Sequence, residues 1–211
     1  MIPLGEWVLF TGAALLMVLT PGPNMIYLLS RSVCQGRRAG FVSLLGVVVG
    51  FLVHVCAAAI GLTAVFMTVP LAYELLKWAG AAYLLWLAFG MLRDAWRGRA
   101  PETVVAKVAP ASLRTVFAQG FLTNVLNPKV ALFFLALLPQ FIDSDAASKP
   151  LAFLFLGAVF IVNGTLFLFV LVAVAAHARR LRVVPNARRA LNAAGGALFA
   201  TLAARLAMAE R

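Results

Sequence analysis

Two proline-containing motifs bring together residue types that can bind a charged small molecule within an apolar chain. They are Thr20-Pro21-Gly22-Pro23-Asn24 and Asn124-Val125-Leu126-Asn127-Pro128-Lys129. Proline removes a backbone donor and disfavours helical geometry in the residue before it, so each motif should interrupt a helix and leave main-chain groups unpaired. Free amides at the start of a helix attract anions. Each motif therefore predicts a helix break that could hold a carboxylate.

Lys129 is the charged side chain of these motifs. It lies well inside its apolar stretch, where an unpaired charge costs roughly 2.5 to 3.5 kcal/mol on insertion scales. We therefore expect Lys129 to face the protein interior. There it could hold a bound carboxylate, change its protonation during a functional cycle, or neutralise the carbonyl groups at a helix end.

Other polar residues in the apolar stretches leave alternatives open. Asn24, Asn124 and Asn127 could offer donors and acceptors to a zwitterion, or could satisfy the broken backbone nearby. His54 could relay a proton or be a packed histidine with its hydrogen bonds satisfied. No Asp or Glu lies in the middle of an apolar stretch, which favours neutral over cationic amino acids and argues against a divalent-cation pathway.

The elements that must position these residues are apolar helices. Hydrophobic residues make up 64% of the 211-residue chain and charged residues 12%, which is far from the composition of a soluble domain. A helix needs about 20 apolar residues to cross a hydrocarbon core. The sequence therefore predicts an all-α integral membrane protein with six transmembrane helices, at about Leu4–Leu29, Gly40–Val69, Leu71–Leu92, Leu113–Ile142, Leu151–Ala176 and Ala190–Met208.

The basic residues between these stretches indicate the orientation. Lys and Arg near span ends stay on the cytoplasmic side of a membrane. They gather in the first, third and fifth inter-span segments: Arg31, Arg37 and Arg38; Arg93, Arg97, Arg99, Lys107 and Arg114; and Arg179, Arg180, Arg182, Arg188 and Arg189. The opposite side holds both termini, which we expect to face outward.

The two proline motifs occupy matching places in two halves of the chain. Half-repeats at about 1–105 and 106–211 contain three predicted spans each, and the first span of each half carries the break. Three spans per half give the halves opposite polarity. Paired Gly/Pro interruptions in such an inverted repeat point to the binding site of a transporter. We therefore interpret residues 1–211 as a single transmembrane transporter domain.

The alternatives to a transporter are a membrane-embedded enzyme and a passive channel. An enzyme needs a nucleophile with its base, or a metal cluster, and these residue types do not assemble either. A channel needs a continuous ring of lining residues rather than two opposed breaks. We expect no catalytic residues, no metal and no cofactor. The net charge of +11 comes from loop residues that face lipid headgroups, so nucleic acid is not an expected partner.

Small residues predict close helix packing at two places. These are Gly46-x-x-x-Gly50 and the patch Ala193-Ala194-Gly195-Gly196-Ala197. Small side chains allow helix backbones to approach each other, either within one chain or between two copies. We expect packing within the chain and keep a homodimer as an alternative.

Further motifs extend along the whole chain. The first half carries Gly36, Gly40, Gly46 and Gly50 after its proline motif, then Lys77-Trp78-Ala79-Gly80-Ala81-Ala82-Tyr83-Leu84; the second half carries Gly120-x-x-x-Asn124-x-x-Asn127-Pro128-Lys129-x-x-x-Phe133 and Pro139-Gln140-Phe141. Together with the first proline motif, these patterns resemble the LysE/RhtB family of amino-acid exporters, and in particular its homoserine and threonine efflux branch.

The resemblance implies a bacterial inner-membrane protein that exports small amino acids or their derivatives, such as threonine, homoserine or its lactone. It also implies that the proton gradient drives export. From the paired helix breaks we expect alternating access, in which the two halves rock around a midplane site lined by Pro21–Asn24 and Asn124–Lys129. Some relatives place an aspartate directly after the second glycine of the Gly46 pattern, where this chain has Phe51, so basic cargo is less expected. The candidate transport residues are Thr20, Pro21, Gly22, Pro23, Asn24, His54, Asn124, Asn127, Pro128, Lys129 and Gln140.

Overall fold

The computed structural model describes residues 4–20, 22–62, 70–97, 108–142, 148–177 and 185–208, and the elements in these ranges are all helices. The α-helices are α1 (Leu4–Leu19), α2 (Pro23–Gln35), α3 (Arg37–Ala57), α5 (Pro70–Arg97), α6 (Leu113–Val125), α7 (Pro128–Leu132), α8 (Lys149–His177) and α9 (Pro185–Met208). Short π-helical turns at Ala58–Leu62 and Phe133–Leu137 follow α3 and α7, and a 3-10 turn covers Leu138–Phe141. The predicted all-α class is confirmed for these residues.

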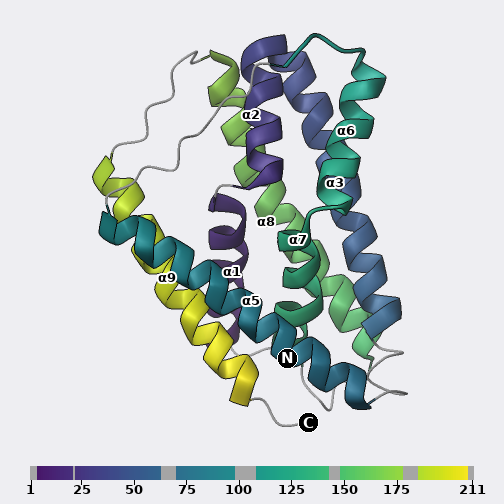
Figure 1. Ribbon diagram of the computed structural model, residues 1–211. Helices are drawn as coiled ribbons and strands as arrows, with labels where there is room; N and C mark the ends of the chain where they lie inside the picture. Colours follow the sequence, from purple (N-terminus) through teal and green to yellow (C-terminus); the bar gives the residue numbers. More distant parts are fainter. Residues whose placement is uncertain are drawn as a thin grey trace.

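Both predicted helix breaks are present. α1 and α2 meet at 54° across the first proline motif, and α6 meets the helical segment that starts with α7 at 46° across the second. The bent pairs stand beside each other in the bundle (Figure 1). Pro23 begins α2 and Pro128 begins α7, positions that suit the fixed φ and missing amide of proline. The predicted site residue Pro21 lies outside the described residues.

The described helices include several that could cross a membrane. Two single helices, Arg37–Gly61 and Lys149–Ala175, are long and apolar enough, and the two bent pairs raise the number to four. The chain is therefore a multi-pass membrane protein. α5 and α9 cover the predicted third and sixth spans, but they do not meet the same test, so the six-span arrangement stays a prediction.

The bundle consists of two groups of helices. α3 packs along α6 and beside α8, while α1 and α2 also contact α8. α5 and α9 pack against each other and run diagonally across the lower part of the bundle in Figure 1. The buried core joins the groups through aromatic and aliphatic side chains of both halves, including Phe51, Phe134, Phe160 and Phe199.

The predicted small-residue contacts form within the chain. A Cβ atom at Gly46 would collide with the main chain of α6 at Phe117, and one at Gly120 would collide with the carbonyl group of Ser43. Gly196 lies in the same way against α5, where a Cβ atom would come 2.6 Å from Leu92. The expectation of intramolecular packing is confirmed at both places, α3 with α6 and α5 with α9.

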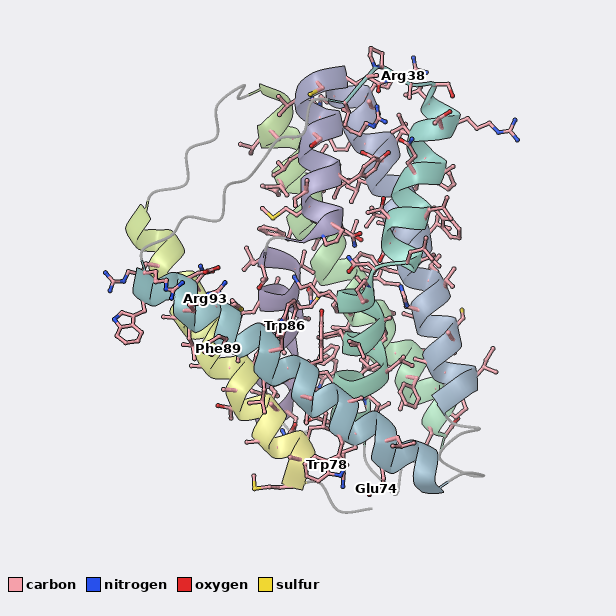
Figure 2. All side chains as sticks on the ribbon, in the orientation of Figure 1. Arg38, Glu74, Trp78, Trp86, Phe89 and Arg93 are labelled. Carbon is pink, nitrogen blue, oxygen red and sulfur yellow. The ribbon has the colours of Figure 1, made fainter. Side chains whose placement is uncertain are left out.

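The outer surface and the helix ends agree with a membrane setting. Figure 2 shows Trp86 and Phe89 on α5, and these side chains are 67% and 65% exposed, as suits a face that meets lipid. In the same view Arg38 lies at the upper end of the bundle and Glu74 at the lower end. At the first turn of α1, Glu6 accepts two hydrogen bonds from Arg205 near the end of α9, at 2.8 and 3.0 Å.

Candidate functional site

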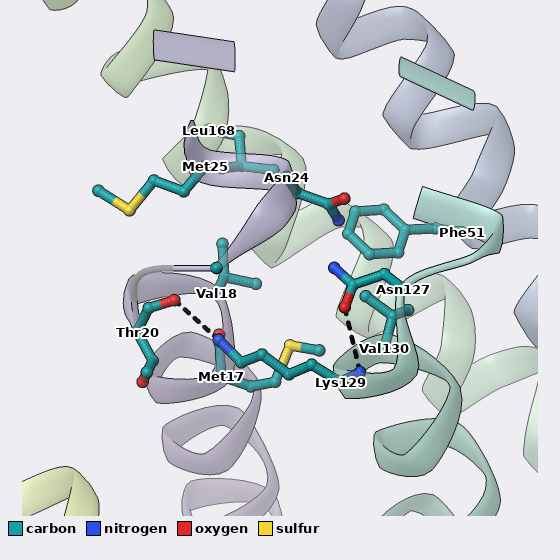
Figure 3. A pocket seen from close by; sticks show the side chains of 11 residues that line it. Met17, Val18, Thr20, Asn24, Met25, Phe51, Asn127, Lys129, Val130 and Leu168 are labelled. Carbon is teal, nitrogen blue, oxygen red and sulfur yellow. Dashed lines mark hydrogen bonds between the residues drawn. The ribbon is translucent and has the colours of Figure 1, made fainter. Parts of the chain in front are cut away.

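The two helix breaks meet at one pocket inside the bundle. Its empty space is about 330 Å³, including the part that opens outward. The first break and the second break contribute residues on opposite sides, and α3 and α8 complete the wall (Figure 3). The lining residues are Met17, Val18, Thr20, Gly22, Asn24, Met25, Phe51, Asn127, Lys129, Val130 and Leu168.

Lys129 reaches from the second break to the first. Its side chain is 9% exposed, which confirms that it faces inward, and its ammonium group donates to the main-chain oxygens of Met17 at 2.6 Å and Thr20 at 2.7 Å. Both carbonyl groups belong to the end of α1, where a helix lacks intrahelical partners. These contacts fit the third predicted role, neutralising a helix end. An ammonium group has three protons, so one remains for another acceptor.

The start of α7 is capped by its own chain. The side-chain oxygen of Asn127 accepts a hydrogen bond from the main-chain amide of Lys129 at 3.1 Å. The carbonyl oxygen of Asn127 accepts from the amides of Val130 and Ala131 at 3.1 and 3.0 Å. Asn127 thus acts as the N-cap of α7, which fixes the backbone of Lys129 in the first turn of that helix, at the pocket wall.

The start of α2 is different, because no side chain caps it. Gly22 is the N-cap residue in an extended conformation, Pro23 has no amide, and the first α-helical hydrogen bond is donated by Ile26 to Gly22. The amides of Asn24 and Met25 are the first free donors of the helix. Both residues line the pocket, so the positive end of α2 faces it.

Asn24 offers an acceptor to the same pocket. Its side-chain oxygen is buried and has no hydrogen-bond partner in the part of the chain that the structure describes. The side chains of Asn24 and Asn127 point toward each other across the pocket (Figure 3). A buried carbonyl oxygen without a partner is unusual in proteins and calls for an explanation.

Several predicted site residues lie outside the pocket. Asn124 is fully buried between helices, and its side-chain amide donates to the carbonyl oxygen of Val47. His54 donates from Nε2 to the main-chain oxygen of Asn124 at 3.1 Å, and its ring stacks on Phe134 at 5.9 Å. Gln140 belongs to the 3-10 turn after the second break. His54 therefore serves the end of α6 much as Lys129 serves the end of α1.

Arg31, which we expect between the first two spans, lies on a helix rather than in a loop. Arg31 lies on α2, is 5% exposed, and donates to Gln35 at 2.9 Å, to the carbonyl oxygen of Ala109 at 2.9 Å and to Gln119 at 2.7 Å. The apolar stretch of the first span ends at Leu29, but α2 continues to Gln35 because polar side chains such as Arg31 form hydrogen bonds with neighbouring segments. Arg31 fastens α2 to α6 and the segment before it.

Phe51 and the other apolar lining residues were not predicted as site residues. Phe51 is 2% exposed, and its ring meets that of Phe160 edge to face at 5.2 Å. The one signal in the sequence is its place directly after Gly50, in the small-residue motif. Met17, Met25 and Leu168 have no sequence signal, because the same residue types fill the core. Within the described residues, no cluster of three or more His, Cys, Asp or Glu side chains could hold a metal.

Comparisons with known proteins place the chain among membrane transporters. The profile of the LysE type translocator family matches residues 15–210. The chain is 33% identical over 199 residues to an uncharacterized membrane protein of Pseudomonas aeruginosa, covering 92% of this chain and 90% of that protein. It is 32% identical over 207 residues to the homoserine/homoserine lactone efflux protein of Salmonella typhimurium, covering 97% of both chains.

A third relative, an uncharacterized membrane protein of Vibrio cholerae, is 32% identical over 193 residues, which is 92% of each chain. No solved structure matches the chain at a significant level. The family profile spans both helix breaks and the pocket between them, and the relatives align over nearly their full length. The chain therefore belongs to the LysE type translocator family.

Proposed function

We propose that this protein is a secondary transporter that exports small neutral amino acids or their derivatives across the bacterial cytoplasmic membrane. Homoserine, its lactone and threonine are the candidate substrates. The family and the name of the Salmonella typhimurium relative support export of this kind. The single observation that carries the proposal is the pocket in which both helix breaks meet beside Lys129.

The carboxylate of the substrate is proposed to bind between the start of α2 and Lys129. The two are close: a Cβ atom built at Gly22 would lie 3.7 Å from the ammonium nitrogen of Lys129. Free amides and the helix dipole favour an anion at this end of α2. The lining residues include one cation and no acid, so the carboxylate would meet an uncompensated positive charge. In a site of low dielectric constant such an attraction is strong.

Alternating access then follows from the contact between Lys129 and α1. The ammonium group joins the second break to the end of the first helix through Met17 and Thr20. A carboxylate that accepts the third proton attracts the ammonium group and draws it away from these carbonyl groups. Binding therefore changes the contact between the two halves, and we propose that six spans in two inverted three-helix repeats rock around it, with both termini on the periplasmic side.

Proton antiport is proposed to supply the driving force. His54 and Lys129 are the titratable side chains that lie at the helix breaks, and each donates to the carbonyl end of a broken helix. A proton lost or gained at Lys129 alters how firmly the end of α1 is held. The proton path is part of the proposal.

Proteoliposomes with the purified protein and an imposed pH gradient test the function. We expect saturable homoserine flux that depends on the gradient and is lost in Lys129→Ala. Lys149→Ala is the matched control, because Lys149 begins α8 and does not line the pocket. Nonsaturable leakage would favour a channel, and conversion of homoserine into another compound would favour an enzyme; either result would refute the proposal.

A further inference from the structure

We infer that Asn24 forms a subsite for the ammonium group of the substrate, beside the carboxylate site. The pocket would then bind homoserine and threonine, which carry both a carboxylate and a free amine, more tightly than the lactone, which offers the amine alone. This inference rests on the proposed function and deepens it. It follows from how the structure divides the work among three asparagines near the helix breaks.

Two of the three asparagines already have structural roles. Asn124 lies outside the pocket lining, against Gly50, and its amide donates to Val47. Asn127 lines the pocket, but its side-chain oxygen is occupied as the cap of α7. That oxygen already accepts from the amide of Lys129, and the amide nitrogen of Asn127 is a donor, which does not suit an ammonium group. The side-chain oxygen of Asn124 also lacks a partner among the described residues, but Asn124 does not line the pocket. Asn24 is therefore the member of the set that combines an unpartnered oxygen with a place in the pocket lining.

The side-chain oxygen of Asn24 could accept a hydrogen bond from a ligand. It is buried, it is without a partner among the described residues, and its residue lines the pocket. Leaving such an oxygen unpaired destabilises the empty protein, whereas an ammonium group supplies the missing donor. Thr20, before the same break, donates its hydroxyl to the main-chain oxygen of Leu16 at 2.6 Å, within its own helix end.

The pocket suits a neutral acceptor better than an acidic one. An aspartate at position 24 would share the pocket with Lys129 and would pair with its ammonium group, which would weaken the attraction for a substrate carboxylate. An amide oxygen accepts from the amine without cancelling that charge. The ring of Phe51 lies next to the Asn24 side chain (Figure 3) and adds an aromatic surface, which also attracts ammonium groups.

The donors for the carboxylate and the acceptor for the ammonium group belong to neighbouring residues of α2, as binding of one α-amino acid requires. The free amides belong to Asn24 and Met25, and the ammonium acceptor is the side chain of Asn24 itself. The carboxylate and ammonium groups of an α-amino acid are separated by a single carbon atom. One turn at the start of α2, with Lys129 opposite, can therefore contact both groups at once. A molecule that lacks either group loses part of the site.

Binding of three ligands of similar size tests the subsite. Homoserine carries both groups, 4-hydroxybutyrate lacks the amine, and homoserine lactone lacks the carboxylate. Calorimetry on the purified full-length protein would measure each affinity for the wild type, Asn24→Leu, Asn24→Asp and Asn163→Leu. Asn163 lies on α8 outside the pocket lining and is the matched control.

We expect wild-type protein and the control to bind homoserine at least about tenfold more tightly than 4-hydroxybutyrate. In Asn24→Leu this preference should vanish, because homoserine binding weakens while 4-hydroxybutyrate binding does not. In Asn24→Asp the acid should favour the cationic lactone over homoserine. Misfolding cannot make a variant bind the lactone more tightly than homoserine. Asn24→Asp therefore still tests the subsite if Asn24→Leu is unstable.

Equal wild-type binding of homoserine and 4-hydroxybutyrate would overturn the ammonium subsite. So would an unchanged preference in Asn24→Leu. Both results would leave the exporter proposal standing, because homoserine would still bind. Failure of the wild-type protein to bind or transport any of these molecules would instead refute the proposed function.

Discussion

The ammonium nitrogen of Lys129 lies 2.6 Å from the main-chain oxygen of Met17, so a side chain of the second half of the chain holds the end of a helix in the first. The contact joins the two broken helices at the point where each has unpaired main-chain groups. It gives Lys129 a structural task in the empty protein and leaves one proton for a ligand. Removal of the ammonium group should therefore affect both stability and transport.

Lys129→Ala should fold and insert but should lose homoserine flux by about 30- to 150-fold, since a buried charged hydrogen-bond partner is worth roughly 2 to 3 kcal/mol. Its thermal unfolding temperature in detergent should fall, because two carbonyl groups at the end of α1 lose their partner. Flux assays and a melting curve, each with Lys149→Ala alongside, measure the two effects. Wild-type flux in the alanine variant would show that the charge is not required.

Pro23→Ala should impair transport. Pro23 is the first residue of α2, and alanine at this position supplies an amide and a strong helix former that favour a continuous helix across the break. We expect the maximal flux to fall by about tenfold, while the amount of inserted protein stays unchanged. Pro150→Ala, in the first turn of α8, is the control. Unchanged flux would mean that the break does not depend on this proline.

His54→Gln and His54→Leu separate a hydrogen-bonding role from a proton-relay role. Nε2 of His54 donates to the carbonyl oxygen of Asn124, and glutamine can donate in its place whereas leucine cannot. We expect His54→Gln to keep flux within about threefold of wild type. His54→Leu should lower the free energy of unfolding by about 1 to 2 kcal/mol, measured in detergent. Loss of gradient-driven flux in the glutamine variant would instead show that the imidazole itself carries a proton.

Gly46→Val should disrupt the packing of α3 on α6. A Cβ atom at this position would collide with the main chain at Phe117, and backbone cannot move aside as a flexible side chain does. We expect a stability loss of about 3 kcal/mol or more, seen as aggregation in size-exclusion chromatography. The same substitution at Gly12, which has open space around it, should leave a monodisperse protein. Two monodisperse variants would contradict the assigned contact.

The helix breaks could be predicted because proline acts locally. Pro23 and Pro128 begin α2 and α7. Each proline ring disfavours the α-helical conformation in the residue before it, and the proline nitrogen cannot donate a hydrogen bond to a preceding turn. The inward position of Lys129 could also be predicted, because a charged side chain inside an apolar stretch is strongly unfavourable in contact with lipid. These features depend on short stretches of sequence or on one strong energy term.

The division of roles among the asparagines could not be predicted. Asn24, Asn124 and Asn127 have the same side chain and similar positions near a break, but one faces the pocket, one crosses to Val47 and one caps a helix. Only the packing of α3, α6 and α2 decides between these outcomes. The apolar wall formed by residues such as Phe51 is hidden for the same reason, since a phenylalanine beside a cavity looks like any other in the sequence.

The ion pair between Glu6 and Arg205 has a consequence for biosynthesis. The two residues are separated by 199 positions, and they bring the first turn of α1 against the last turns of α9. The ribosome synthesises α1 long before it translates Arg205. Until α9 has entered the bilayer, α1 is therefore without one of its packing partners. This contact can form only after α9 has been synthesised, so a nascent chain that stalls before α9 lacks the ion pair that holds the start of α1.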